Sequence, residues 1–168
     1  MERTMNHASK PGEESGREYL AFSLGGEEYA VNILKVQEIR AYERVTRIAN
    51  MPAYIKGVMN LRGAVVPVVD LRVRFNIGSA EFNASTIVIV INIGPRTIGM
   101  VVDGVSDVVI LKTSDVRPAP QIAGVLTAEF LEGVAILDQR MLIIVEIDGL
   151  MSSKEMGLLD GVATARAA

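Results

Sequence analysis

The chain has 168 residues, no cysteine, no tryptophan and a single histidine, His7, in a polar N-terminal stretch. These absences exclude disulfides, thiolate chemistry and zinc–cysteine sites, and they argue against histidine-based catalysis or metal binding. The net charge is −3 but uneven: residues 34–75 carry eight Lys or Arg against three Asp or Glu, whereas residues 103–160 carry four against ten. This asymmetry favours docking to charged protein partners, because nucleic-acid-binding domains are usually basic.

Residues 1–16 are polar, have no hydrophobic periodicity and lack the apolar segment of a signal peptide, so they predict a disordered tail. No uninterrupted apolar run is longer than that of residues 87–91, which is far shorter than a membrane span. We therefore expect a cytoplasmic protein that does not insert into the membrane. Its ordered domain should cover residues 17–160, followed by a frayed tail over residues 161–168.

The first ordered elements are predicted from alternating apolar residues. Residues 20–24 and 29–33 each have the two-residue period of a half-buried strand, and the Gly25-Gly26 pair between them is typical of a hairpin turn. Over residues 33–39 the apolar positions lie three apart, which predicts one or two helical turns. Residues 45–49 predict a short strand.

The next segments combine turn residues with apolar runs. Pro52 is expected to open a helical turn that ends at Gly57. Residues 58–71 predict two strands around the turn Asn60-Leu61-Arg62-Gly63. Pro67 has no amide donor, so we expect it at a sheet edge, a bulge or a break in pairing.

The second half of the chain predicts further hairpins and a closing helix. Strand patterns cover residues 86–93, 97–102, 105–111, 130–137 and 141–147, the third of these extending the hairpin before it. A polar connection spans residues 75–85, and the prolines of residues 117–120 exclude a helix there. Ser152 and Glu155 have the spacing of a capping box, which predicts a short C-terminal helix.

About ten short strands with little helix indicate an all-β protein, most simply one of small barrels, because closure removes exposed strand edges. The strands fall into two groups along the chain, near residues 18–75 and 86–147, which suggests two subdomains.

No catalytic motif is present. The sequence has no phosphate-binding GxxxxGK[ST], no GxGxxG and no GxSxG motif. Acidic residues such as Asp103 and Asp107 lack the spacing of an established metal site, so we expect them to be solvated or to cap turns. The sequence therefore predicts no enzyme activity, no cofactor and no bound metal.

A few residues allow both a structural and a functional interpretation. Arg62 is either an exposed turn residue or a group presented to a partner carboxylate, since arginine forms directional pairs. Gly57 either ends a helix or leaves the backbone open to close approach. Val36 and Ile39 are either core residues or part of a contact surface, and residues 117–120 are either a rigid loop or a docking element.

Several stretches together resemble the CheW family of bacterial chemotaxis coupling proteins, with enterobacterial members closest. The resemblance rests on their order and spacing across residues 18–159. The matching stretches are residues 29–40, residues 52–63 ending in Asn60-Leu61-Arg62-Gly63, the stretch Val66-Pro67-Val68-Val69-Asp70-Leu71, and residues 99–108.

This resemblance implies two five-stranded SH3-like barrels on a shared apolar core. It implies a non-enzymatic adaptor that joins the cytoplasmic tip of chemoreceptors to the regulatory domain of the histidine kinase CheA. Other CheW copies would be partners in the rings that build receptor arrays, to which the protein would be recruited at the membrane.

The resemblance also implies contact residues, which we carry over by position. Receptor-side positions are Val36, Glu38, Gly57, Asn60 and Arg62. Kinase-side positions are Arg117, Gln121 and Ile122, with a second group at Arg44, Val45 and Thr46. Gln121 and Ile122 depart from the acid and the aromatic residue that many relatives carry there.

Two other classes compete with this interpretation. A scaffold of the CheV type, or a kinase regulatory domain, has the same fold but would carry further domains, and the polar tails here favour a free-standing adaptor. A small-barrel nucleic-acid-binding protein would need exposed aromatic residues on a basic face, and aromatic residues make up only 5% of the chain.

Overall fold

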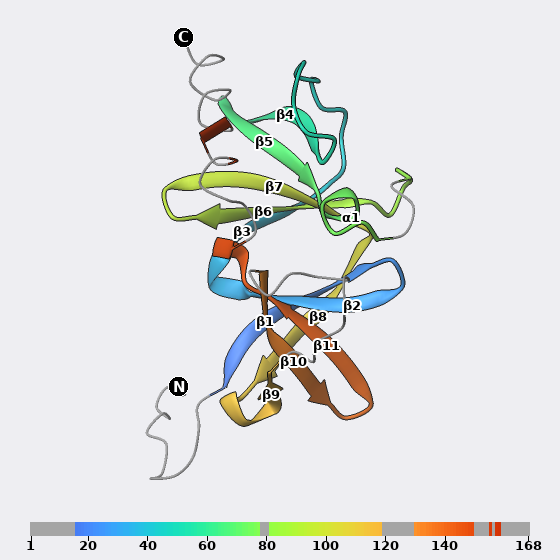
Figure 1. Ribbon diagram of the computed structural model, residues 1–168, viewed down its shortest axis with the longest axis vertical. Helices are drawn as coiled ribbons and strands as arrows, with labels where there is room; N and C mark the ends of the chain where they lie inside the picture. Colours follow the sequence, from blue (N-terminus) through green and yellow to red (C-terminus); the bar gives the residue numbers. More distant parts are fainter. Residues whose placement is uncertain (1–15, 78–80, 119–129, 150–154, 156, 159–168) are drawn as a thin grey trace.

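The computed structural model describes residues 16–77, 81–118, 130–149, 155, 157 and 158, and these contain eleven strands and a few short helical turns (Figure 1). The first five strands are β1 (Arg17–Leu24), β2 (Glu27–Asn32), β3 (Val36–Ala41), β4 (Ile55–Leu61) and β5 (Ala64–Asp70). The others are β6 (Ile87–Ile93), β7 (Arg96–Val102), β8 (Gly104–Leu111), β9 (Val116–Arg117), β10 (Leu131–Leu137) and β11 (Arg140–Val145). The helical turns are η2 (Ile33–Lys35), α1 (Leu71–Arg74), η3 (Thr113–Asp115) and η5 (Ile147–Gly149).

The strands form two sheets that lie one above the other (Figure 1). One has the order β8-β1-β2-β11-β10-β9. Its two edge strands, β8 and β9, are joined along the chain by η3, so this sheet curls into what we call the six-stranded barrel. Curling brings the edges together and leaves little unpaired backbone exposed.

The other sheet has the order β3-β6-β7-β5-β4 and forms the five-stranded barrel. Its edge strands are β3 and β4, and the segment between them closes the barrel. Thr46 pairs with Val58 of β4 through two backbone hydrogen bonds of 2.8 and 2.9 Å. The strand predicted over residues 45–49 is therefore wrong except for this single bridge between Thr46 and Val58.

Apolar residues form three clusters, and the largest joins the two barrels. The inside of the six-stranded barrel holds one cluster, which includes Tyr19, Leu142 and Ile144. The inside of the five-stranded barrel holds another, made largely of valines such as Val68, Val88 and Val90. The third lies between the barrels and takes side chains from both sheets, among them Phe22, Leu24, Tyr29, Ile89, Ile91 and Met100. The predicted all-β fold of two barrels on a shared apolar core is confirmed, with the two-residue β9 as a sixth strand in one of them.

The predicted hairpins β1–β2, β4–β5, β6–β7 and β10–β11 are confirmed. The assignment of strands to two groups along the chain is wrong, because each sheet takes strands from both halves. The parallel pairs β5–β7 and β2–β11 join distant segments, and β8 leaves the preceding hairpin to pair with β1. Pro67 lies beside a break in pairing, as expected, because the parallel ladder to β7 begins at Val68.

The helical turns predicted over residues 33–39 are wrong beyond Lys35. Only η2 is helical, and β3 begins at Val36. A register shift between Val36 and Glu38 inserts one extra residue into β3. Val36 and Ile39 therefore pair with Ile91 and Ile89, two residues of the shared core, although they lie three positions apart. The bulge explains the helix-like spacing.

Gly57 does not end a helix. Pro52 accepts one hydrogen bond from the Ile55 amide, at 3.0 Å, and β4 begins at Ile55. Gly57 lies within β4 at a register shift and has a φ of 146°. A Cβ atom there would lie 2.1 Å from the Thr46 carbonyl oxygen, so the close approach of backbone requires glycine.

The two predicted tails and most of the predicted C-terminal helix lie outside the described residues, except Gly16 and three positions of the helix. Those three, Glu155, Gly157 and Leu158, have helical conformation. In the described part of the chain, no helix has the length and hydrophobicity needed to cross a membrane.

Candidate functional site

Glu38 and Arg62 form an ion pair where the two edges of the five-stranded barrel approach each other. Glu38 lies on β3, and Arg62 lies in the β4–β5 turn with Nη2 2.5 Å from Glu38 Oε2. Asn60 shapes this turn, since its Oδ1 accepts a hydrogen bond from the Gly63 amide at 2.7 Å. The hydrogen bond from Arg62 lowers the pKa of the Glu38 carboxyl and keeps it charged.

The bulge in β3 places Val36 and Glu38 on different faces of the strand. Glu38 pairs with Val90, which belongs to the inner cluster of the five-stranded barrel, whereas Val36 pairs with Ile91 of the shared core. Directly paired residues share a face of the sheet. Val36 therefore faces the junction of the barrels, and the Glu38–Arg62 pair lies at the edge of the five-stranded barrel.

Gly57, a predicted receptor-side residue, lies next to Thr46, a predicted kinase-side residue. The backbone of Gly57 packs against the backbone of Thr46. The two predicted groups thus meet at this point of the five-stranded barrel. Here the role of Gly57 is to let the segment around Thr46 approach β4.

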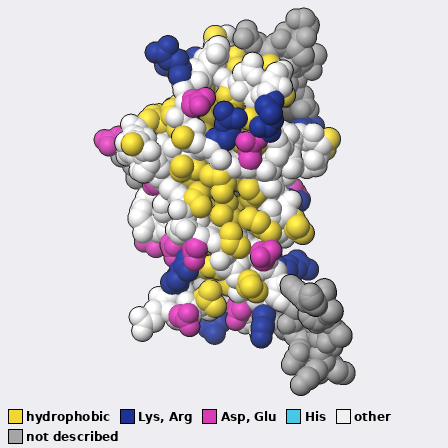
Figure 2. Space-filling model, turned by 180° about the vertical axis from the view of Figure 1, so that it is seen from behind, with side chains coloured by type: hydrophobic (Ala, Val, Ile, Leu, Met, Phe, Trp, Pro, Cys, Tyr) yellow, Lys and Arg dark blue, Asp and Glu magenta, His cyan; other side chains and the backbone are white. Residues whose placement is uncertain are grey.

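A groove with exposed apolar walls lies beside η2, the turn that leads along the chain from the six-stranded to the five-stranded barrel, and we call it the junction groove. It measures about 790 Å³ and is lined by residues of β1, β2, η2 and β8, which include the charged Arg17 and Glu18 as well as the apolar Ile33, Leu34 and Ile110. Leu34 is 85% exposed and Ile110 is 61% exposed, although both are apolar. Figure 2 shows hydrophobic side chains gathered across the middle of one face of the molecule, with charged groups above and below them. Apolar area left uncovered in this way marks an interaction surface.

A second pocket, which we call the basic pocket, lies in the five-stranded barrel and measures about 560 Å³. Its lining combines apolar and cationic side chains from the segment between β3 and β4, from β4 and from the loop before β6. The lining residues are Tyr42, Arg44, Val45, Arg47, Ile48, Met51, Pro52, Ala53, Ile55, Lys56 and Phe82. Among the described residues, no carboxylate pairs with Arg44, Arg47 or Lys56.

An aromatic wall completes the basic pocket. The ring of Phe82 stacks on Tyr42 with 4.3 Å between centroids. Lys56 Nζ lies 5.8 Å from the Phe82 centroid and the Arg72 guanidinium carbon 4.9 Å from it. The sequence predicts only a polar connection over residues 75–85 and does not single out Phe82, Arg47 or Lys56. The excess of positive charge over residues 34–75 is a signal for Arg47 and Lys56 but not for Phe82.

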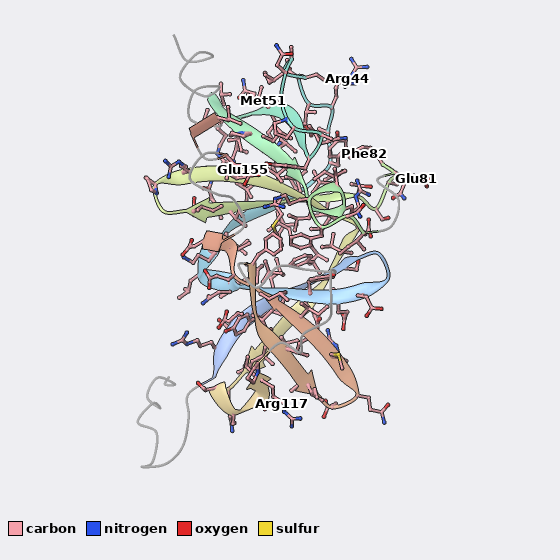
Figure 3. The ribbon with its side chains drawn as sticks, viewed as in Figure 1. Arg44, Met51, Glu81, Phe82, Arg117 and Glu155 are labelled. Carbon is pink, nitrogen blue, oxygen red and sulfur yellow. The ribbon has the colours of Figure 1, made fainter. Side chains whose placement is uncertain are left out.

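Arg117 lies at the opposite end of the molecule from Arg44 (Figure 3). It belongs to β9 and pairs with Val134 of β10. Two residues further along β10, Ile136 pairs with Met141, and these two side chains are 42% and 61% exposed. Arg117 thus borders an exposed apolar pair, which the alternating pattern of β10 does not reveal. Gln121 and Ile122 lie outside the described residues.

Asp103 and Asp107, which lack the spacing of a metal site in the sequence, are engaged in ion pairs. Asp103 pairs with Arg72 at 3.1 Å, and Asp107 pairs with Arg140 at 2.9 Å. Over the described ranges, no group of three or more His, Asp or Glu side chains is arranged to hold a metal ion.

Two small barrels packed on a common core, with exposed apolar and basic surfaces, define an SH3-like scaffold protein. Comparison with known proteins gives the family. The model of the CheW-like domain matches residues 18–155. The chain is 55% identical over 152 residues to chemotaxis protein CheW of Klebsiella aerogenes, covering 90% of this chain and 92% of that protein.

Two further relatives agree. Chemotaxis protein CheW of Rhizobium meliloti is 39% identical over 90% of this chain and 97% of its own length. The crystal structure of the scaffolding protein TtCheW from Thermoanaerobacter tengcongensis superposes with a TM-score of 0.77 at 31% identity, covering 83% of this chain and 95% of that one. The chain belongs to the CheW family of chemotaxis scaffold proteins.

Proposed function

We propose that the chain is a non-enzymatic adaptor that couples the cytoplasmic tip of a chemoreceptor to the regulatory domain of the histidine kinase CheA. The observation that carries this proposal is the presence of separate exposed surfaces of different chemistry. One is the apolar groove at the junction of the barrels, and the others lie at the two ends of the molecule. An adaptor needs such separation in order to hold two partners at once.

The junction groove is the proposed receptor surface. An amphipathic helix can bury its apolar face in a groove of this kind, and Leu34 and Ile110 leave apolar area available for it. Val36 faces the junction, and the Glu38–Arg62 pair adds charges that can fix the position of a helix along the surface. Asn60 and Gly57 support this surface by shaping the turn and the strand.

The two ends of the molecule are the proposed kinase surfaces. The basic pocket includes Arg44 and Val45, with Thr46 beside it, and the opposite end carries Arg117 next to Ile136 and Met141. Two different surfaces at opposite ends make head-to-tail contacts, and such contacts close into rings when the rotation between neighbours allows it. Ring neighbours would be the CheA regulatory domain and other copies of the chain, with residues 121–122 contributing to the contact.

The protein would work in the cytoplasm and would reach the membrane by binding its receptor. It would need no cofactor, metal or nucleic acid. If the receptor surface prefers one receptor conformation while the kinase surfaces hold the kinase, receptor state and kinase state become linked. Modest individual contacts suffice, because ring assembly adds avidity.

Bridging is tested directly by mixing a receptor-tip fragment and the CheA regulatory domain with and without the chain, and measuring complex size by sedimentation. The proposal predicts a three-component species only when the chain is present. Sedimentation of the two partners as separate species in the presence of folded chain would contradict it.

A further inference from the structure

Arg72 is a buried arginine at the start of α1, with 3% of its surface exposed. Its Nε and Nη2 donate to the two carboxylate oxygens of Asp70, both at 3.0 Å. Its Nη1 donates to Asp103 Oδ1 at 3.1 Å and to the Glu81 carbonyl oxygen. One guanidinium therefore joins the end of β5, the segment between β7 and β8, and the loop before β6. We call Asp70, Arg72 and Asp103 the charge cluster.

The charge cluster reaches the six-stranded barrel through Asp103. This residue lies where the chain passes from β7 of the five-stranded barrel to β8 of the six-stranded barrel. Asp103 Oδ2 accepts a hydrogen bond from the Gly25 amide in the β1–β2 turn at 2.8 Å, and its own amide donates to the Ser23 carbonyl at 3.0 Å. Asp103 thus connects Arg72 to the β1–β2 hairpin of the other barrel.

The charge cluster reaches the basic pocket through Phe82. The Arg72 guanidinium carbon lies 4.9 Å from the Phe82 ring centroid, and Arg72 also holds the neighbouring Glu81 carbonyl. Phe82 is 40% exposed, and its ring also contacts Tyr42 and Lys56. Arg72 thus contacts both the Phe82 ring and the backbone of the residue before it.

We propose that Arg72 is a positioning residue that sets the Phe82 wall of the basic pocket according to the placement of the two barrels, which it senses through Asp103. A buried charge whose partner moves is costly to leave unpaired, so the members of the cluster move together. A shift of the six-stranded barrel at the junction then reaches the basic pocket through three side chains. The inference rests on the proposed function in one respect: the pocket is taken as the kinase surface and the junction as the receptor surface.

The substitution Asp103→Asn tests the connection without any partner. Asp103 accepts from Arg72 with one oxygen and from Gly25 with the other. An asparagine side chain has one acceptor oxygen, and its NH2 group only donates. One of the two hydrogen bonds that Asp103 accepts must therefore break. The matched control is Asp107→Asn, which removes a carboxylate paired with Arg140 on the same strand region but leaves the charge cluster intact.

The readout is the NMR signals of the Phe82 and Tyr42 rings and of the Val45 and Ile48 methyl groups in the free protein. We expect Asp103→Asn to shift them and Asp107→Asn to leave them unchanged. Unshifted signals in folded Asp103→Asn would overturn the inference. The NMR comparison uses no binding partner, so it tests the inference separately from the proposed function. The proposed function fails if the wild-type chain binds neither the receptor-tip fragment nor the CheA regulatory domain.

A double-mutant cycle on the folded variants adds a second measurement. Asp103→Asn and Phe82→Leu should each weaken binding of the CheA regulatory domain by about two- to tenfold, the range expected when one side chain must be ordered on binding. The double variant should be no weaker than Phe82→Leu alone, because both changes act on the same wall. Additive losses would overturn the inference.

Discussion

The Arg62 guanidinium, in a turn at one edge of the five-stranded barrel, donates to the Glu38 carboxylate on the strand at the other edge. This pair is the only described side-chain ion pair that links β3 to the β4–β5 turn. Arg62 is 65% exposed and has a φ of 53°, so it is held at the surface by its turn and by Glu38. The charges of this pair are therefore placed for contact with a partner while contributing little to the core.

Arg62→Glu should weaken binding of the receptor-tip fragment by about tenfold, because it places a like charge beside Glu38 and removes the directional arginine. Binding is measured by titration calorimetry, and the melting temperature serves as the folding control. The double variant Glu38→Arg, Arg62→Glu restores the opposite charges and should recover part of the affinity. Unchanged receptor binding by folded Arg62→Glu would remove this pair from the receptor surface.

Leu34→Ser should weaken receptor binding with little change in stability, because Leu34 is 85% exposed and has almost no buried area to lose. Met141→Ser is the matched control, since it removes an exposed apolar side chain at the far end of the six-stranded barrel. We expect the control to leave receptor affinity unchanged. Equal losses in the two variants would show that general surface hydrophobicity, and not the junction groove, governs binding.

Arg44→Glu should weaken binding of the CheA regulatory domain, and the loss should shrink as salt is raised, because the effect comes from exposed charges that salt screens. Lys35→Glu makes the same kind of change of charge in η2, outside both proposed kinase surfaces, and serves as the control. The affinity of each variant for the CheA regulatory domain is measured at low and at high salt. A loss in Lys35→Glu as large as that in Arg44→Glu would mean that only net charge matters.

Gly57→Ala should lower the free energy of unfolding by about 2 kcal/mol or more, because a Cβ atom would meet the Thr46 carbonyl oxygen at 2.1 Å. Gly63→Ala is the control for backbone strain alone: Gly63 also has positive φ, but a Cβ atom there meets nothing within 4 Å. It should cost about 1 kcal/mol. Urea denaturation measures both, and equal costs would contradict the close approach at Gly57.

Arg140→Gln should lower stability in a pH-dependent way. The Arg140 guanidinium hydrogen-bonds Glu28 and Asp107 at 2.9–3.1 Å, and this lowers the pKa of each carboxyl below its ordinary 4.5 and 3.8. A pKa lowered by folding stabilises the folded state above the unfolded-state pKa, and the stabilisation is lost as the pH falls through the folded-state pKa.

The difference in stability between wild type and Arg140→Gln should thus be about 0.5–1 kcal/mol at pH 7 and shrink below about pH 4. Urea denaturation at pH 7, 5 and 3 measures it. Arg44→Gln removes an arginine that pairs with no described carboxylate, and it should show no such pH dependence. A difference that grows toward low pH would contradict the assignment.

Local features of the fold could be predicted from the sequence, whereas the pairing between distant strands could not. The β6–β7 hairpin is encoded by adjacent apolar runs and the turn at Gly94, which has positive φ. The parallel pair that joins β2 to β11 brings Tyr29 beside Ile143 and has no signal in either segment. The three-residue spacing of Val36 and Ile39 predicts a helix, but a bulge in a strand produces the same spacing.

The candidate surfaces were only partly predictable, for the same reason. Arg62 could be chosen because a glycine-containing turn exposes its residues. Leu34 could not, since leucine side chains are more often buried than exposed, and only the structure shows that this one is 85% exposed. The contact of Arg72 with Phe82 depends on a loop that folds back over α1, which composition and periodicity do not indicate.

The central claim is that separate surfaces of one chain bind receptor and kinase. An NMR titration of the labelled protein, first with a receptor-tip fragment and then with the CheA regulatory domain, tests it most directly. The account predicts shifts at Leu34, Val36 and Arg62 with the receptor fragment, and at Arg44, Val45 and Arg117 with the kinase domain. Overlapping shifts from both partners, or no shifts from either in the folded protein, would contradict it.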